Sequence, residues 1–281
     1  MTTQTQPELT PRPLALVTGA SSGIGLELAK QFAERGFDLL IAAETSDITL
    51  AAEELRALGA QVETSVVDLR TFDGVERLVD DVRGAQTGGR TLEAVAINAG
   101  VGAGGSFAGT GRGDATEKTT ALRDELDIID LNITSSVHLA KRVVPQLVEQ
   151  GHGRVLFTSS IAATMPGPYE AVYAASKAFV QSFSQALRYE LKDSGVTVTT
   201  VLPGPTDTDF FERGDLMDTK VGQGHKDDPA EVAQQAVEAL LDGKDQVVGG
   251  ATKNKVQAAG ARLMSDQKKA AMHARLAEPK A

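Results

Sequence analysis

The sequence predicts an α/β fold, a single doubly wound domain with a parallel seven-stranded sheet flanked by helices. Short apolar runs alternate with helical stretches, which is the pattern of repeated strand–helix–strand units. The runs are apolar throughout rather than strictly alternating, so we expect helices on both faces of the sheet. The right-handed crossover rule then makes the sheet doubly wound. The predicted strands are 14–18, 39–43, 62–67, 94–97, 154–158, 196–202 and 246–249.

Apolar spacing predicts the helices and the faces that they turn to the sheet, because residues three or four apart share a helix face. Long helices are expected at about 122–149 and 169–194, and a later helix is expected to have Asp228 as its cap and Pro229 at its first position. The stripes expected to face the sheet are Ile24, Leu28 and Phe32; Val75, Leu78, Val79 and Val82; and Phe179, Phe183, Leu187 and Leu191.

Length and composition indicate one folded domain, residues 14–250, with a tail at each end. The chain has 281 residues, of which 41% are hydrophobic and 23% charged, as in ordinary globular proteins. Residues 1–13 hold three prolines among polar residues and predict a disordered N-terminal tail. Residues 251–281 carry seven Lys or Arg against two acids and predict a basic C-terminal helical extension. We expect that extension to be solvated or to cover a neighbouring subunit, with an anionic membrane surface as the alternative.

Charge and residue usage exclude several function classes. A net charge of -10 argues against a protein that grips nucleic acid, since that affinity rests on Lys and Arg. No apolar run approaches about 18 residues, so we expect no membrane span and no signal peptide, and a cytoplasmic location. The chain has no cysteine, and its four histidines lack ligand spacing, so no disulfide, Cys nucleophile or metal site is expected.

A glycine-rich turn directly follows the first predicted strand. Residues 18–25 read TGASSGIG, and a helix is expected to open at once. Glycines let the backbone turn sharply and approach a ligand, while free N–H groups and the positive end of the helix dipole favour a pyrophosphate. The turn therefore predicts a Rossmann-type dinucleotide site.

The same turn also contains the pattern G-x-S-x-G of hydrolase nucleophiles, at residues 19–23. A serine hydrolase would use Ser21 as nucleophile, with His225 or His273 as the base. Only one strand precedes this turn, whereas the hydrolase pattern normally follows several strands. Hydrolysis is kept as the less favoured alternative.

Tyr173 and Lys177 lie four residues apart, so on a helix their side chains share one face. A neighbouring cation stabilises a phenolate, and we expect Lys177 to lower the pKa of Tyr173 toward the range of an acid/base catalyst. Ser160 stands thirteen residues upstream, after a predicted strand, where the carboxyl end of that strand meets the crevice.

Together these motifs resemble the short-chain dehydrogenase/reductase family from about Leu14 to Gly250. The motifs that carry the resemblance are TGASSGIG, Asp68 in VVDL, Asn98-Ala99-Gly100, Asn132 in LDIIDLN, Ser160, Tyr173-x-x-x-Lys177, and Pro203-Gly204 with Thr208 in PGPTDT.

The resemblance implies an oxidoreductase that transfers a hydride between a nicotinamide dinucleotide and a carbonyl or secondary alcohol. It implies that Tyr173 exchanges a proton with the substrate oxygen and that Ser160 hydrogen-bonds this oxygen. Lys177 would hold the nicotinamide ribose, and Asn132 would anchor a water chain to Lys177. A non-catalytic dinucleotide-binding sensor is the alternative.

The resemblance also implies the cofactor contacts. Asp68 would meet the adenine, Asn98 the adenosine ribose side, and Thr206 and Thr208 the carboxamide and phosphate region. The other expected cofactor-binding residues are Gly19, Ser21, Ser22, Gly23, Ile24, Gly25, Glu44, Leu69, Ala99, Gly100, Tyr173, Lys177, Pro203 and Gly204.

NAD is favoured over NADP because an acid after the second strand binds a ribose 2′-OH, whereas a 2′-phosphate needs Arg or Lys. Glu44 stands at that point. The usual acid of the family would fall one position earlier, at Ala43, and Thr45 and Ser46 could receive a phosphate, so NADP stays possible.

Two further segments are expected to border the substrate, a small molecule. Residues 101–121 contain six glycines and would rim the site, and residues 209–228 would form a mobile lid. Phe210, Phe211 and Met217 would form an apolar pocket wall or serve only lid packing. By analogy with the family, we expect a homodimer or homotetramer built on the two long helices.

Overall fold

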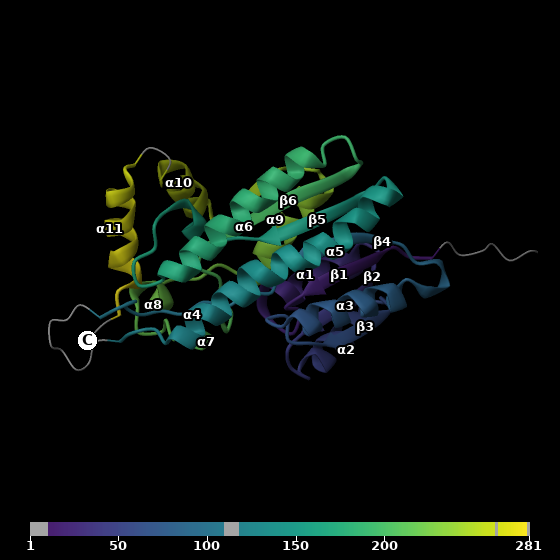
Figure 1. Cartoon of the computed structure of the whole chain (residues 1–281), viewed down its shortest axis with the longest axis horizontal. Coiled ribbons are helices and arrows are strands. Elements are labelled where there is room, and N and C mark those ends of the chain that lie inside the picture. Colours follow the sequence, from purple (N-terminus) through teal and green to yellow (C-terminus); the bar gives the residue numbers. More distant parts are fainter. Residues whose placement is uncertain (1–10, 110–117, 262–263, 280–281) are drawn as a thin grey trace, which may run out of the picture.

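The computed structural model describes residues 11–109, 118–261 and 264–279, and it contains one parallel sheet. The strand order is β3-β2-β1-β4-β5-β6-β7, so the predicted doubly wound sheet is confirmed (Figure 1). Each strand lies where the apolar runs predict it. The bounds are β1 Leu14–Thr18, β2 Asp38–Ala43, β3 Val62–Val66, β4 Leu92–Ile97, β5 Gly153–Thr158, β6 Val196–Pro203 and β7 Gln246–Gly249.

Helices cover both faces of this sheet. Helices α1, α2 and α9 pack on one face, and α3, α5 and α6 pack on the other. Side chains alternate between the two cores: Val17 of β1 points to the first, and Leu16 to the second. The bounds are α1 Gly23–Glu34, α2 Ile48–Ala57, α3 Phe72–Ala85, α4 Leu122–Ile128, α5 Ser135–Gln150, α6 Ala171–Glu190, α7 Phe210–Arg213, α8 Lys220–Gln223, α9 Pro229–Leu241, α10 Thr252–Ala261 and α11 Asp266–Ala277.

The apolar stripes of α1 and α3 pack on the sheet as predicted, but the stripe expected on α6 is wrong at its first position. Phe179 is 39% exposed. The other three stripe residues, Phe183, Leu187 and Leu191, pack against the sheet core as predicted. The buried side chains of α6 include Ser176, Val180 and Ser184, and the Ser184 hydroxyl lies 2.5 Å from that of Thr200 on β6. Small side chains let this helix approach the strand closely, so the bulkier Phe179 lies at the edge of the contact.

The first predicted long helix is interrupted. A π-helical segment, Ile129–Thr134, joins α4 to α5 and contains Asn132. Such segments are rare and are frequently found at functional sites. The second long helix is confirmed as the continuous α6.

The N-terminal segment is anchored by a side chain. Of the predicted N-terminal tail, residues 1–10 lie outside the described residues. Arg12 donates hydrogen bonds to the carbonyls of Gly36 (2.8 Å) and Ala33 (3.2 Å).

The predicted cap of the later helix is confirmed, since the Asp228 carboxylate accepts from Ala230 N–H (2.9 Å) at the start of α9.

The C-terminal extension is helical and contacts the rest of its own domain, while the expectation that it is solvated, covers a neighbouring subunit or meets a membrane stays a prediction. Its two helices, α10 and α11, lie beside α8 and the short 3₁₀ helix Ile161–Thr164 (Figure 1). Asn254 on α10 is buried and donates to the Gly249 carbonyl (3.0 Å). Within the described part of the chain, no helix has the length and apolar character needed to cross a membrane.

Candidate active site

One cavity of about 580 Å³ opens at the carboxyl ends of β1, β2, β4, β5 and β6, where α/β sheets bind ligands. Nearly all the residues expected to bind the cofactor or to react line it. These are Gly19, Ser21, Ser22, Gly23, Ile24, Glu44, Asp68, Leu69, Asn98, Ala99, Gly100, Ser160, Tyr173, Lys177, Pro203, Gly204, Thr206 and Thr208. Gly25 and Asn132 are the exceptions, because they lie behind the wall.

The glycine-rich turn brings the backbone close to the neighbouring strands. Gly19 adopts φ +66°, and a Cβ there would lie 2.9 Å from the Ala99 Cα. Gly25, expected among the cofactor-binding residues, packs beneath the turn, where a Cβ would lie 2.0 Å from the Gly19 carbonyl oxygen. Its role is to let α1 start directly under the turn.

The first turn of α1 fits an anionic ligand. The Ser22 side chain makes no capping hydrogen bond, and the turn contains no acidic residue. Its N–H groups and the positive end of the helix dipole therefore remain available for a pyrophosphate. This local chemistry is what a dinucleotide requires.

At the far end of this wall, three carboxylates surround one guanidinium. Arg70 forms an ion pair with Glu44, and its guanidinium lies 2.9 Å from Asp68 and 3.3 Å from Asp127. These contacts hold the pKa of the Asp68 carboxyl below its usual value, chiefly through the hydrogen bond from Arg70. Sequence reasoning missed Arg70; its position directly after Asp68-Leu69 at a strand end could have indicated it.

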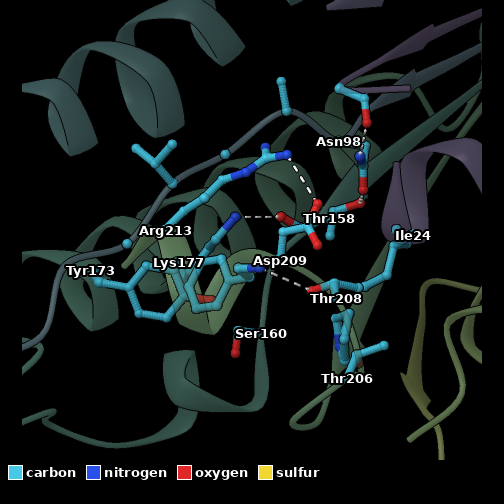
Figure 2. A pocket seen from close by; sticks show the side chains of 18 of the residues that line it. Ile24, Asn98, Thr158, Ser160, Tyr173, Lys177, Thr206, Thr208, Asp209 and Arg213 are labelled. Atoms are coloured by element: carbon cyan, nitrogen blue, oxygen red, sulfur yellow. Dashed lines mark hydrogen bonds and ion pairs between the residues drawn. The ribbon is translucent and has the colours of Figure 1, made fainter. Parts of the chain in front are cut away.

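Ser160, Tyr173 and Lys177 project toward the same cavity (Figure 2). Ser160 follows β5, while Tyr173 and Lys177 lie on one face of α6. The Lys177 ammonium donates to the Thr158 carbonyl (3.1 Å) and lies 5.8 Å from the centre of the Tyr173 ring. The Ser160 hydroxyl accepts from Ala162 N–H (3.1 Å), which fixes its position.

The expected lowering of the Tyr173 pKa by Lys177 is absent from the protein alone. Burial raises the pKa of this phenol, the nearby charge of Glu170 raises it further, and a hydrogen bond with Ser160 opposes both effects. Burial also lowers the pKa of Lys177 to about 8. The Lys177 ammonium faces the Thr158 carbonyl rather than the phenol oxygen, which explains why burial, and not this cation, determines the direction of the Tyr173 pKa shift.

Asn132 and Thr158 brace the site from behind. The Asn132 amide accepts from Val101 N–H (2.9 Å), donates to the Val101 carbonyl (2.9 Å) and donates to the Ser176 hydroxyl (2.9 Å). The Thr158 hydroxyl donates to the Asn98 side chain (3.0 Å) (Figure 2). Thr158, absent from the sequence prediction, thereby links the Lys177 contact to the cofactor wall.

The remaining wall comes from the predicted rim, the predicted lid and the C-terminal extension. Val101 and Gly102 line the cavity as expected of the rim, although residues 110–117 of that segment lie outside the described residues. The Phe210 ring lies 5.2 Å from the Tyr173 ring, and Phe211 also lines the cavity. Met217 is 48% exposed and does not contribute. Val221, from the predicted lid, also lines the cavity. Further lining residues that sequence reasoning did not place here include Met165, Glu170, Gln257, His273 and Leu276.

The hydrolase alternative does not fit this geometry. A serine nucleophile needs a base within hydrogen-bond reach. His225 is exposed and does not line the cavity, while His273 contacts the Pro168 carbonyl and Glu170 instead of Ser21.

Comparisons with known proteins identify the family of this chain. Residues 13–217 match the short chain dehydrogenase family. Sulfoacetaldehyde reductase 2 of Chromohalobacter salexigens is 35% identical over 199 residues, which is 70% of this chain and 74% of the relative. Oxidoreductase UcpA of Salmonella typhimurium is 30% identical over 227 residues, 80% of this chain and 79% of the relative.

Solved structures give the same result. A short-chain dehydrogenase from Sphingobium yanoikuyae in complex with NADPH superposes with a TM-score of 0.75 at 28% identity, covering 89% of this chain and 93% of that one. A short-chain dehydrogenase/reductase from Burkholderia phymatum in complex with NAD has a TM-score of 0.77 at 21% identity, covering 90% and 93%, and shows the fold alone.

Proposed function

This chain belongs to the short-chain dehydrogenase/reductase family, and from that premise we propose that it transfers a hydride between a nicotinamide dinucleotide and a small-molecule carbonyl or secondary alcohol. The observation that carries the proposal is the convergence of Ser160, Tyr173 and Lys177 on the cavity that also holds the glycine-rich turn. A dinucleotide-binding protein without turnover would not need this buried acid/base group.

In the proposed reaction, the bound dinucleotide supplies or accepts the hydride, and the protein handles the proton. In the reducing direction, the Tyr173 hydroxyl gives its proton to the carbonyl oxygen while the carbon gains the hydride, which leaves an alcohol. Ser160 donates a hydrogen bond to the same oxygen. The Lys177 cation stabilises the phenolate that forms, and the turn at 18–25 with the start of α1 holds the pyrophosphate.

The test separates binding from turnover. Tyr173→Phe removes only the hydroxyl, so we expect NADH affinity to stay within about tenfold of the parent by nicotinamide fluorescence, while turnover falls at least about 100-fold, as is typical of a missing acid/base group. Tyr189→Phe, on the exposed end of α6, is the matched control and should change neither. If the parent protein binds NADH tightly but turns over no carbonyl, the non-catalytic sensor is favoured. If it binds neither NADH nor NADPH, both the oxidoreductase and the sensor hypotheses are refuted.

We further propose that NAD is preferred over NADP. The support is the ion pair between Glu44 and Arg70 and the placement of that cation among three carboxylates, which a 2′-phosphate would have to displace. Glu44→Arg should shift the ratio of NADH to NADPH affinity at least about tenfold toward NADPH, while Glu53→Arg, exposed on α2, makes the same charge change elsewhere and should leave the ratio alone. A parent protein that already binds NADPH more tightly would refute this preference.

The expectation of a homodimer or homotetramer also remains a proposal. Leu122, Leu126, Ile129 and Phe179 are exposed large apolar residues on the helices expected to form the contact. Light scattering of the parent protein and of Phe179→Asp would test it, because a charge in a subunit contact should lower the measured mass.

A further inference from the structure

Two buried titratable side chains in the cavity have no part in the proposed reaction. Glu170 directly precedes α6, three residues before Tyr173, and His273 lies on α11. Their side chains are 8% and 10% exposed, and the Glu170 Oε2 lies 3.5 Å from the His273 Nε2. Both line the same cavity as the acid/base group.

The Glu170–His273 pair lacks a hydrogen-bond donor when Glu170 is ionised. The His273 Nδ1 lies 3.3 Å from the Pro168 carbonyl, which can only accept, so Nδ1 carries the hydrogen. Neutral imidazole then presents a lone pair at Nε2. An ionised Glu170 also presents only lone pairs, so two acceptors then face each other; a protonated Glu170 donates to Nε2 and leaves its second oxygen as the acceptor. Among the described residues, no side chain or backbone group donates a hydrogen bond to the Glu170 carboxylate.

The neighbouring charges do not resolve this mismatch. Burial lowers the pKa of His273 and raises that of Glu170 to about 7, so the imidazole is neutral and part of the carboxyl is ionised near neutral pH. The other cations of the cavity wall are already engaged: Arg213 pairs with Asp209 (3.1 Å), and Lys177 donates to a carbonyl. A ligand that carries a hydrogen-bond donor can donate to the Glu170 carboxylate, to the His273 Nε2, or to both.

The surroundings restrict what such a guest looks like. The cavity that holds the pair is also lined by the apolar side chains of Met165, Phe210, Phe211, Val221 and Leu276; Phe210 lies beside Tyr173 and Leu276 is on α11. Helix α11 is held in place by a hydrogen bond from the Tyr169 hydroxyl to the Glu278 carboxylate (3.0 Å) and by contacts with α8. The cavity therefore suits an apolar body with one polar end.

We propose that Glu170 and His273 form a polar subsite of the substrate pocket that receives a hydrogen-bond donor, a hydroxyl or a primary ammonium, at the end of the substrate away from the reacting carbonyl. This inference rests on the proposed function for the location of the reacting carbon. An anionic substituent at the same place would face the Glu170 carboxylate and is disfavoured.

The probes are aryl ketones that differ only in the remote substituent. We would compare 4′-ethylacetophenone with its 4′-hydroxymethyl, 4′-aminomethyl and 4′-carboxylate counterparts, together with the 3′ isomers. The subsite predicts that the hydroxymethyl or aminomethyl compound has a kcat/KM at least about tenfold above that of the ethyl compound, and the carboxylate the lowest of the four. Comparison of the hydroxymethyl with the aminomethyl compound shows whether the subsite prefers a hydroxyl or an ammonium group.

Substitutions then assign the preference to the pair. Glu170→Met and His273→Phe remove the acceptors and should bring the donor-bearing and ethyl compounds within about threefold of each other. Glu53→Met and His152→Phe make the same changes at exposed positions and should retain the parent ratio.

A binding measurement keeps this inference separate from the proposed function. The alcohols that correspond to the four ketones are titrated into the protein saturated with NADH. The reduced dinucleotide cannot accept a hydride, so the alcohols are not oxidised, and nicotinamide fluorescence reports their affinity. Stronger binding of the donor-bearing alcohols that is lost in Glu170→Met supports the subsite, even if no ketone is reduced and hydride transfer is thereby refuted. Equal affinities within about threefold, or preference for the carboxylate, would overturn the subsite whatever the turnover.

Discussion

The burial of Glu170 makes a prediction about stability that can be worked from its pKa. Burial raises the pKa of this carboxyl from 4.5 to about 7, so the folded state binds a proton more tightly than the unfolded chain does. The folded state is therefore favoured below pH 4.5 and loses this advantage as the pH rises to about 7. The difference corresponds to about 3 kcal/mol, the most by which ionised Glu170 can weaken the fold at pH 8.

Glu170→Gln keeps the shape of the side chain and removes the ionisation. The amide can also donate to the His273 Nε2, so we expect the variant to be more stable than the parent at pH 8, by up to about 3 kcal/mol, and the gain to shrink steadily toward pH 5. Urea unfolding at several pH values measures this difference, provided that the dependence on urea concentration stays the same.

The control for this measurement is Glu53→Gln on the exposed face of α2, which makes the same side-chain change at a solvent-exposed position. A Glu170→Gln variant that is destabilised at pH 8 would refute the reasoning. That result would mean that Glu170 is ionised and stabilised by a protonated His273, so that the pair needs no donor from a guest.

Three further outcomes follow from the structure. Gly25→Ala places a Cβ 2.0 Å from the Gly19 carbonyl oxygen, so we expect NADH affinity to fall at least about tenfold in a fluorescence titration. Gly84→Ala on α3 meets nothing within 4 Å and should instead stabilise the fold by up to about 1 kcal/mol in urea unfolding, since alanine favours a helix over glycine. Asp228→Ala removes the cap that Ala230 N–H uses and should cost about 1 kcal/mol by the same assay, while NADH affinity stays at the parent value.

Sequence reasoning succeeds here where short stretches of chain decide the outcome. Each strand is a local apolar run, and the start of α9 is indicated by Asp228 and Pro229 alone. The glycine-rich turn is equally local, because the strand before it and the helix after it are adjacent in the chain. These features place most of the cavity wall without knowledge of the tertiary structure.

The residues that were missed depend on contacts between distant segments. His273 reaches Pro168 and Glu170, about a hundred residues earlier, and nothing in the weakly amphipathic sequence of α11 indicates that partner. Arg70 pairs with Glu44 at a neighbouring strand end and with Asp127 on α4, and both partners are distant in the sequence. The exposed position of Phe179 follows from the close approach of α6 to β6, which helical periodicity does not report.

The order of segments along the chain has a practical consequence for protein engineering. The groups proposed for dinucleotide binding and proton transfer all precede Ala261, whereas His273 and Leu276 on α11 close the pocket from a later segment. Truncation after Ala261 would remove α11, which keeps the sheet and the acid/base group and opens one side of the pocket to bulkier molecules. Exchanging the segment after Ala261 between related proteins offers a way to transplant substrate choice while keeping the catalytic apparatus unchanged.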